Sequence, residues 1–394
     1  MIRPVTITSS RLVLVVVMSL LTIGVVARGR ADEAVQLNEP FKGITRDGTP
    51  VRGLFPLRST GVSTAPVRMA AAAFLASLTP EQKTGTAFPA DSEEWRDWQN
   101  IHRYVRKGIN FKSMTASQRV RAMELLRASL SARGLQKSQN VMRLNQTIAE
   151  MTQKFDEYGD GLYHLTVMGE PSENAPWGWQ LDGHHLAINY FVLRDQVVMT
   201  PAFMGSEPVI AEDGVHKGTS VMQDEQNKGL ALMTSLRPDQ RTQATLVAGP
   251  KAGNNALTQA FRDNITLDFA GIKASALDDK QRTLLLDVVA EYVNNMAPGH
   301  AKVRMDEVRE HLSETYFGWI GEVGPETVFY YRIHSPVILI EFDHQLPVAL
   351  PGPRVPNRRH VHSVVRTPNG NDYGKDLLRQ HYEATRANPA HGHQ

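Results

Sequence analysis

The sequence contains 394 residues, in which 43 Lys and Arg nearly balance 41 Asp and Glu, and it has no cysteine. The lack of cysteine excludes disulfide bonds and thiolate chemistry. The balanced charge gives no reason to expect nucleic acid or an anionic membrane surface as a partner. A chain of this length buries enough apolar surface to be stable without covalent cross-links.

Residues 1–31 have the pattern of a secretory signal peptide. Arg3 and Arg11 supply a basic start, and Leu12–Val26 is an uninterrupted stretch of fifteen apolar or neutral residues. This length suits a signal-peptide core and is short of the ~20 residues that span a bilayer. We therefore expect cleavage near Ala31 and export to the periplasm or the cell exterior, with no membrane span in the mature form. The alternative is an uncleaved anchor helix.

The segment 32–66 is polar, rich in Gly, Pro and Arg, and without sustained periodicity, which predicts an extended arm. We expect residues 67–387 to form a single composite domain and residues 388–394 to be a frayed tail. The first predicted helix of the domain lies at Met69–Ser77, where alanines and larger apolar residues follow helical spacing.

A short phrase that ends in glutamine recurs four times and has the spacing of a helix start. In three of the four copies a Thr or Asp stands three residues before the Gln, which is the spacing of a capping box. The gaps between successive glutamines are unequal, so the phrase is interpreted as repeated helix-start chemistry and not as a repeat architecture. The copies are Leu78–Gln82, Met114–Gln118, Leu236–Gln240 and Leu277–Gln281.

Two blocks of strand-like sequence flank a helical region. Residues 162–204 are rich in aromatic and β-branched residues and predict an antiparallel meander. Helices are predicted at about 220–236, 255–262 and 279–296, and again at Tyr373–Ala387. The second block comprises Thr327–His334, Val337–Asp343 and His360–Arg366. The predicted fold is α+β, with a mostly antiparallel mixed sheet built from both blocks and helices packed on or beside it.

Three pairs of metal-ligand residues stand two positions apart in the predicted strands. Side chains at i and i+2 point to the same face of a strand, so each pair could present two ligand atoms together. Imidazole and carboxylate groups suit Zn²⁺ or non-haem Fe²⁺. The pairs are Asp182 with His184, Glu341 with Asp343, and His360 with His362.

These pairs lead to a hypothesis of one divalent metal ion, Zn or Fe, bound by histidines and a carboxylate. His185 points away from His184 in a regular strand, so only one of the two joins unless Gly183 forms a bulge. Each pair alone is also compatible with an ordinary polar strand face. The predicted metal ligands are His184, His185, His360, His362 and Glu341, and the predicted catalytic residues are Glu341, Asp343 and His381.

Several of these motifs, taken in order, resemble the uncharacterised bacterial and fungal family known as domain of unknown function 3500. The resemblance covers about residues 66–384, but the family brings no agreed activity and therefore no catalytic residue. It implies only that the histidines and carboxylates above belong to its signature. The motifs are Gly178–Leu186, Phe329–Ile333, Ile340–Asp343, His360–Ser363, Asn371–Gly374, Leu377-Leu378 and His381-Tyr382.

Three kinds of function remain open from the sequence. The first is an exported metal-dependent enzyme, either a hydrolase that acts on an unknown small molecule through a metal-activated water or, with iron or copper, an oxidoreductase. The second is a protein that binds a sugar or small ligand on a strand face carrying Trp177 and Trp179. The third is a structural partner of an envelope complex.

Overall fold

The fold is organised around one sheet of twelve strands, in the order β1-β3-β4-β5-β7-β12-β11-β10-β9-β8, with β2 paired to β3 and β6 to β5. A computed structural model describes residues 37–247 and 254–387. Residues from Phe41 onward form one compact unit. The predicted signal peptide and the predicted tail, 388–394, lie outside the described residues.

The first half of the unit contributes helices and then the first strand block. The helices are α2 (Ala65–Ala76), α3 (Pro80–Thr86), α4 (Ala116–Ser129) and α5 (Ala132–Thr152). The strands are β1 (Ala87–Phe88), β2 (Ile109–Asn110), β3 (Tyr163–Met168), β4 (Trp177–Gly183), β5 (Leu186–Leu193), β6 (Gln196–Val198) and β7 (Ala202–Ser206).

The second half has the same general order. Its helices are α6 (Gln223–Ser235), α7 (Pro238–Ala244), α8 (Asp279–Val293) and α9 (Pro298–Glu310), and α10 (Lys375–Ala387) closes the chain. Its strands are β8 (Ile272–Lys273), β9 (Tyr316–Gly321), β10 (Phe329–His334), β11 (Leu339–His344) and β12 (Val361–Arg366).

The antiparallel pairing of β7 with β12 joins the two strand blocks into a single sheet. All other named strand pairs are also antiparallel except β1 with β3. The predicted α+β fold, with a mostly antiparallel mixed sheet drawn from both blocks, is confirmed.

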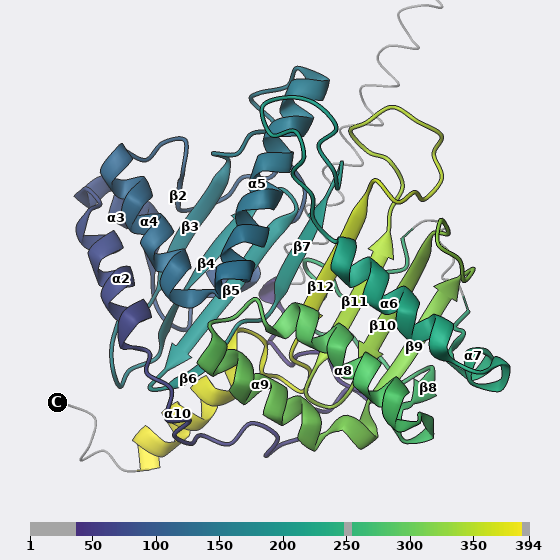
Figure 1. Ribbon diagram of the computed structural model, residues 1–394. Helices are drawn as coiled ribbons and strands as arrows, with labels where there is room; N and C mark the ends of the chain where they lie inside the picture. The colour runs from purple at the N-terminus through teal and green to yellow at the C-terminus, as the bar shows by residue number, and fades with distance from the viewer. Residues whose placement is uncertain (1–36, 248–253, 388–394) are drawn as a thin grey trace, which may run out of the picture. The chain divides into compact units, whose positions relative to one another are not determined.

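The two faces of the sheet are covered differently. One face packs on α4, α5, α6 and α8 through a continuous apolar core that includes Leu181, Ile188 and Phe342 (Figure 1). On the other face, polar and charged side chains are buried beneath the arm, the long loops before β2 and β8, and the segment that begins α10. Alternation along the strands produces this division, because successive side chains point to opposite faces.

The four glutamine phrases begin helices, as predicted. In each, the Gln side chain accepts the backbone N–H of the residue three positions earlier, at 2.9–3.0 Å. The glutamines also meet in pairs: Gln118 Nε2 donates to Gln82 Oε1 at 2.7 Å, and Gln240 and Gln281 donate to each other at 2.9–3.0 Å. Each pair links two helix starts of one half.

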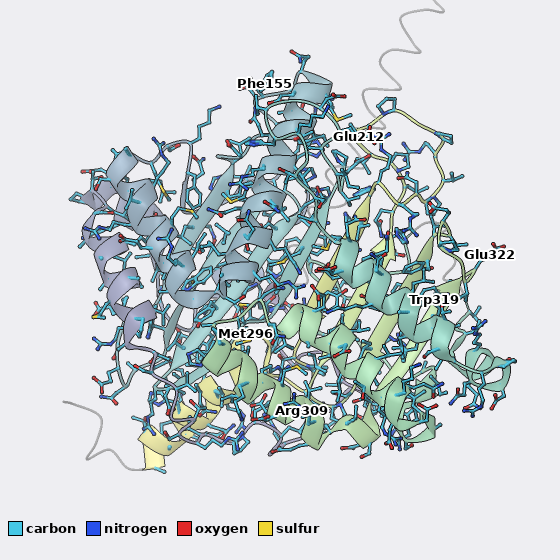
Figure 2. The ribbon with its side chains drawn as sticks, viewed as in Figure 1. Phe155, Glu212, Met296, Arg309, Trp319 and Glu322 are labelled. Carbon is cyan, nitrogen blue, oxygen red and sulfur yellow. The ribbon has the colours of Figure 1, made fainter. Side chains whose placement is uncertain are left out.

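The two halves of the unit place their strands in the same order on either side of the β7–β12 pair. On either side of that pair the sheet continues outward through corresponding strands, β5-β4-β3 and β11-β10-β9. The segments that follow α4 and α8 meet where Leu130 forms an antiparallel bridge with Met296, which is labelled in Figure 2. The interpretation of the phrases as helix-start chemistry is thus confirmed, and the two glutamine pairs stand at the helix starts of the two halves.

One predicted helix is absent. Residues 255–262 are irregular, because the backbone N–H groups of Asn255, Leu257 and Thr258 donate to the carboxylates of Glu341 and Asp343 instead of to helical carbonyls. These acceptors come from a strand more than eighty residues later in the chain, so local sequence carries no signal for them.

His344, at the end of β11, predicts a pH effect on stability. Phe329 N donates to its Nδ1 at 3.0 Å and its Nε2 lies 2.9 Å from Gln226 Oε1, which fits the neutral ring. Burial lowers its pKa to about 4. In the unfolded state His344 takes up a proton below pH ~6.5, whereas in the folded state it remains neutral down to about pH 4. The free energy of unfolding therefore falls as the pH is lowered from about 6.5 to about 4.

We expect urea denaturation at pH 7, 6 and 5 to show a smaller loss of unfolding free energy for His344→Gln than for the unmodified protein. The difference should reach up to about 1.4 kcal/mol per pH unit. Equal pH slopes for the two proteins would contradict the assignment of a neutral His344.

Candidate metal centre

His185 occupies the tight turn between β4 and β5. Its backbone adopts φ +61°, an uncommon left-handed conformation for a histidine. The turn is held from both sides, because His185 N donates to Asn100 O at 3.1 Å and His185 O accepts from Gly205 N at 2.8 Å. Gly183 has to precede it, since a Cβ at that position would lie 2.3 Å from the Tyr163 ring.

His360 and His362 come from the beginning of β12, next to that turn. Their spacing of two places both side chains on the loop-covered face, as predicted. His362 is paired across the sheet with Gly205 of β7, the same residue that bonds to His185. The pairing of β7 with β12 thus brings His185 into contact with His360, 175 positions later in the chain.

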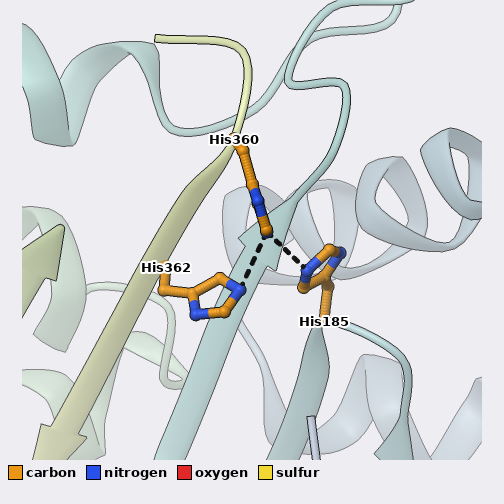
Figure 3. A group of neighbouring side chains, drawn as sticks. All are labelled: His185, His360 and His362. Carbon is orange, nitrogen blue, oxygen red and sulfur yellow. Dashed lines mark hydrogen bonds between the residues drawn. The ribbon is translucent and has the colours of Figure 1, made fainter. Parts of the chain in front are cut away.

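The three imidazoles meet through their Nε2 atoms (Figure 3). His360 Nε2 lies 3.2 Å from His185 Nε2 and 3.0 Å from His362 Nε2. One ligand nitrogen from each ring lies within 4.8 Å of the others. A tetrahedral ion with bonds of ~2.0–2.1 Å holds its ligand nitrogens about 3.3 Å apart, so the observed spacing fits a metal ion.

The hydrogen bonds around His360 fix its tautomer. Its Nδ1 lies 2.6 Å from Leu346 O, a carbonyl that only accepts, so Nδ1 carries the proton and Nε2 presents its lone pair to the other rings. A single lone pair cannot accept well from two N–H groups, whereas a cation satisfies all three nitrogens. His362 Nδ1 is buried without a partner among the described residues.

The cluster is buried and held neutral. His360, His362 and His185 are 2%, 9% and 6% exposed. Burial lowers the pKa of all three imidazoles, and the neighbouring histidines lower it further for His185 and His362. Neutral imidazole is the form that binds a metal, so protons compete weakly for this site.

Glu207 supports the cluster from behind and was not predicted from the sequence. Its buried carboxylate accepts the N–H groups of Val348, Ala349 and Leu350 at 3.0–3.2 Å and lies 3.8 Å from His360 Nδ1. It thereby anchors the loop whose Leu346 carbonyl orients His360. A lone Glu before a Pro has no distinguishing pattern, so only the tertiary structure identifies it.

Glu207→Ala is expected to weaken metal binding by 10- to 100-fold, the usual effect of losing a group that orients a ligand histidine. Three backbone N–H groups also lose their acceptor, so the unfolding free energy should fall by about 1–3 kcal/mol. Isothermal titration with Zn²⁺ and urea denaturation measure the two effects. Unchanged affinity in a folded Glu207→Ala protein would show that the loop needs no carboxylate anchor.

His184 lies beside the cluster. Its ring stacks on His185 with centroids 3.9 Å apart, and its Nδ1 lies 2.8 Å from Asn145 Oδ1. The left-handed turn at His185 allows both histidines to reach the same region, which a regular strand would prevent. The structure thus brings His185 into the group of three, with His184 as its packing partner.

Glu341 and Asp343 lie on the same face of the sheet as His362, but their oxygens are bonded elsewhere. Glu341 accepts from Thr258 N, Leu257 N and Tyr330 OH at 2.6–3.0 Å. Asp343, although paired across the strands with His362, accepts from Asn255 N at 2.7 Å and Gln345 Nε2 at 2.5 Å. Burial raises the pKa of Asp343 to about 7, although the hydrogen bonds from the loop act to lower it. In this structure both carboxylates hold the 254–259 loop.

His381 and Asp182, the other predicted candidates, are also placed apart from the group of three. Burial lowers the pKa of His381, on α10, and the nearby charge of Arg194 lowers it further. Arg194 follows β5, at the other end of that strand from His185, about 25 Å away along the strand. Asp182 pairs with Arg106 at 3.0 Å beneath the loop before β2.

The two tryptophans proposed as a ligand platform lie in the core. Trp177 and Trp179 are fully buried. Trp179 stacks on Tyr190, and its Nε1 donates to Ser129 Oγ of α4 at 3.1 Å. A sugar has no access to either indole, so the binding surface expected at this strand face is not present.

Comparison with known proteins places this geometry within a family but not within a described function. No curated protein and no solved structure matches the chain. The family model described as "Protein of unknown function (DUF3500)" matches residues 60–375 and so includes every histidine of the cluster. The chain therefore belongs to the DUF3500 family.

Proposed function

We propose that this protein is an exported enzyme that uses one metal ion, held by His185, His360 and His362, to hydrolyse a small molecule. The observation that carries the proposal is the convergence of three buried, neutral imidazoles through Nε2 at the spacing of a metal site. The fixed tautomer of His360 supports it, because an Nδ1–H bonded to a carbonyl is the usual second contact of a ligand histidine.

The ligand set favours zinc. Three imidazoles with a fourth position left for water form a catalytic zinc site, whereas non-haem iron oxygenases use two histidines and a carboxylate. Glu341 and Asp343 of the neighbouring strand accept hydrogen bonds from the 254–259 loop, and Glu207 accepts them from residues 348–350. Zn²⁺ bound in this way lowers the pKa of a coordinated water toward ~7, which supplies a nucleophile at neutral pH.

The surroundings favour a small substrate. Each imidazole of the cluster is less than a tenth exposed, which leaves little room for a large ligand. Low water content strengthens the interaction between the site and charge that develops during attack on a carbonyl or phosphoryl group. His360, fixed by Leu346 O and Glu207, holds the position of the site during the reaction.

Export remains part of the proposal and is supported by the basic, apolar and small-residue pattern of residues 1–31. Within the part of the chain that the structure describes, no helix has the length and apolar character needed to cross a membrane. Detection of the mature N-terminus near Asp32 in the secreted or periplasmic fraction, by mass spectrometry, would test this point.

The metal is tested on tag-free protein by elemental analysis and titration. We expect close to one equivalent of Zn²⁺ per chain, removal by a chelator, and a tetrahedral Co²⁺ absorption spectrum after replacement. Hydrolysis of a panel of nitrophenyl esters and phosphoesters should stop with chelation and return with Zn²⁺. Failure to bind Zn²⁺, Co²⁺ or Fe²⁺ would overturn the whole proposal. A loaded protein that hydrolyses nothing, but consumes O₂ with Fe²⁺, would overturn the hydrolase alone.

A further inference from the structure

A partly enclosed cavity lies on the helix-covered face of the β7–β12 pair, the opposite face of the sheet from His360 and His362. Its volume of about 60 Å³ is several times the ~15 Å³ of accessible space that one water molecule needs. Its walls come from α8 and α9 on one side and from the β6–β7 segment and β12 on the other. They include Val198, Met199, Met204, Val293, Val303 and Val365.

One polar atom in the wall lacks a partner. Asn295, which follows α8, is 4% exposed, and its Oδ1 has no hydrogen-bond partner among the described residues. The nearest contact of its Nδ2 is the sulfur of Met204 at 4.0 Å, a weak acceptor. Since Asn295 lines the cavity, a molecule inside with an O–H or N–H group could satisfy this acceptor.

The charged groups in the wall are already neutralised. Arg304 pairs with Glu307 at 2.8 Å and donates to Val337 O at 2.6 Å and Thr367 Oγ1 at 3.1 Å. Burial lowers the pKa of His300, so its ring is neutral at pH 7. The cavity therefore has no spare charge for an ionic ligand.

The two halves differ in how the helix that precedes their long strands packs against the sheet. In the first half α5, the counterpart of α9, packs directly on β5 and β7. In the second half the principal contacts of α9 are with α8 and the turn that follows α9, and the cavity lies where contact with the sheet would be. The same element order thus gives a closed interface in one half and a cavity in the other.

We propose that this cavity is a second ligand site, which binds a small, uncharged and largely apolar molecule whose single hydroxyl or N–H donates to Asn295 Oδ1. The site is separate from the metal centre. His362 lies on the loop-covered face of β12, whereas Ser363 and Val365, which line the cavity, alternate with it and point to the helix-covered face.

A matched series of probes tests the site on the full-length protein. Pentan-1-ol and hexan-1-ol should bind saturably in titration calorimetry and raise the melting temperature, and each should bind about fivefold more tightly than the methyl ether of equal length, the effect of one hydrogen bond. Asn295→Leu should remove the preference for the alcohol and retain ether binding. Val303→Phe, which fills the cavity, should abolish binding of both.

Val105→Phe, at a position 80% exposed, controls for an added ring and should bind like the unmodified protein. No saturable binding by any probe, or binding that persists unchanged in Val303→Phe, overturns the proposal. If Val303→Phe does not fold, an unchanged alcohol preference in Asn295→Leu overturns it equally. Metal content should be the same in every variant, so this outcome is independent of the metal centre.

Discussion

His362→Ala is expected to abolish tight metal binding. The variant removes one of three nitrogens that meet within 4.8 Å and leaves two histidines, too few to hold Zn²⁺ at an open site. Loss of a supporting group alone costs 10–100-fold in metal affinity, so loss of a ligand should cost more than about 100-fold. Elemental analysis of tag-free protein and competition titration with a chromogenic chelator measure the change.

The matched control is His184→Ala. His184 stacks on His185 and is equally buried, yet it lies outside the group of three. It should keep close to one equivalent of metal, with a modest loss of affinity from the lost stacking. Metal-free His362→Ala should remain folded, because the substitution removes a buried Nδ1 that has no partner among the described residues. Equal metal content in both variants would show that the ion is bound elsewhere.

Arg366→Met is expected to cause the largest loss of stability. Arg366 is fully buried on the loop-covered face and bonds to Asp372 at 2.8 Å and Asp263 at 2.5 Å. Asp263 also accepts from Arg96 at 2.9 Å, so one network joins β12, both long loops and the start of α10. Methionine leaves Asp372 without its cation, and breaking a buried pair in this way costs about 3–5 kcal/mol.

Arg46→Met provides the comparison for Arg366→Met. Arg46 pairs with Asp268 at 2.9 Å, but both side chains are more than 60% exposed, so its loss should change the unfolding free energy by less than about 1 kcal/mol. Urea denaturation of the two variants measures the difference. If Arg366→Met were as stable as Arg46→Met, the network would contribute nothing beyond surface charge.

The network also explains part of the family signature. Asp372 and Tyr373, in the Asn-Asp-Tyr-Gly motif, bond to Arg366 and Asp263 inside the protein. The motif therefore fixes the start of α10 against the sheet. β12 carries the chain away from His360 and His362 before the motif begins.

Local sequence patterns predicted most helices and strands and two of the three clustered histidines. Strand periodicity placed His360 and His362 on one face, and capping chemistry located the glutamine helix starts, because these features depend on neighbours in sequence. The sequence did not predict that Gln82 pairs with Gln118 and Gln240 with Gln281, because each pair joins helix starts that lie 36 or 41 positions apart.

The sequence by itself thus determined the α+β class, the strand pairs of ligand-type residues and the helix starts. Only the tertiary structure decided which residues meet. The left-handed turn at His185 selects it over His184, the 254–259 loop occupies Glu341 and Asp343, and Glu207 reaches the site through a loop far along the chain. Each of these outcomes depends on hydrogen bonds between segments distant in sequence, for which short-range periodicity carries no information.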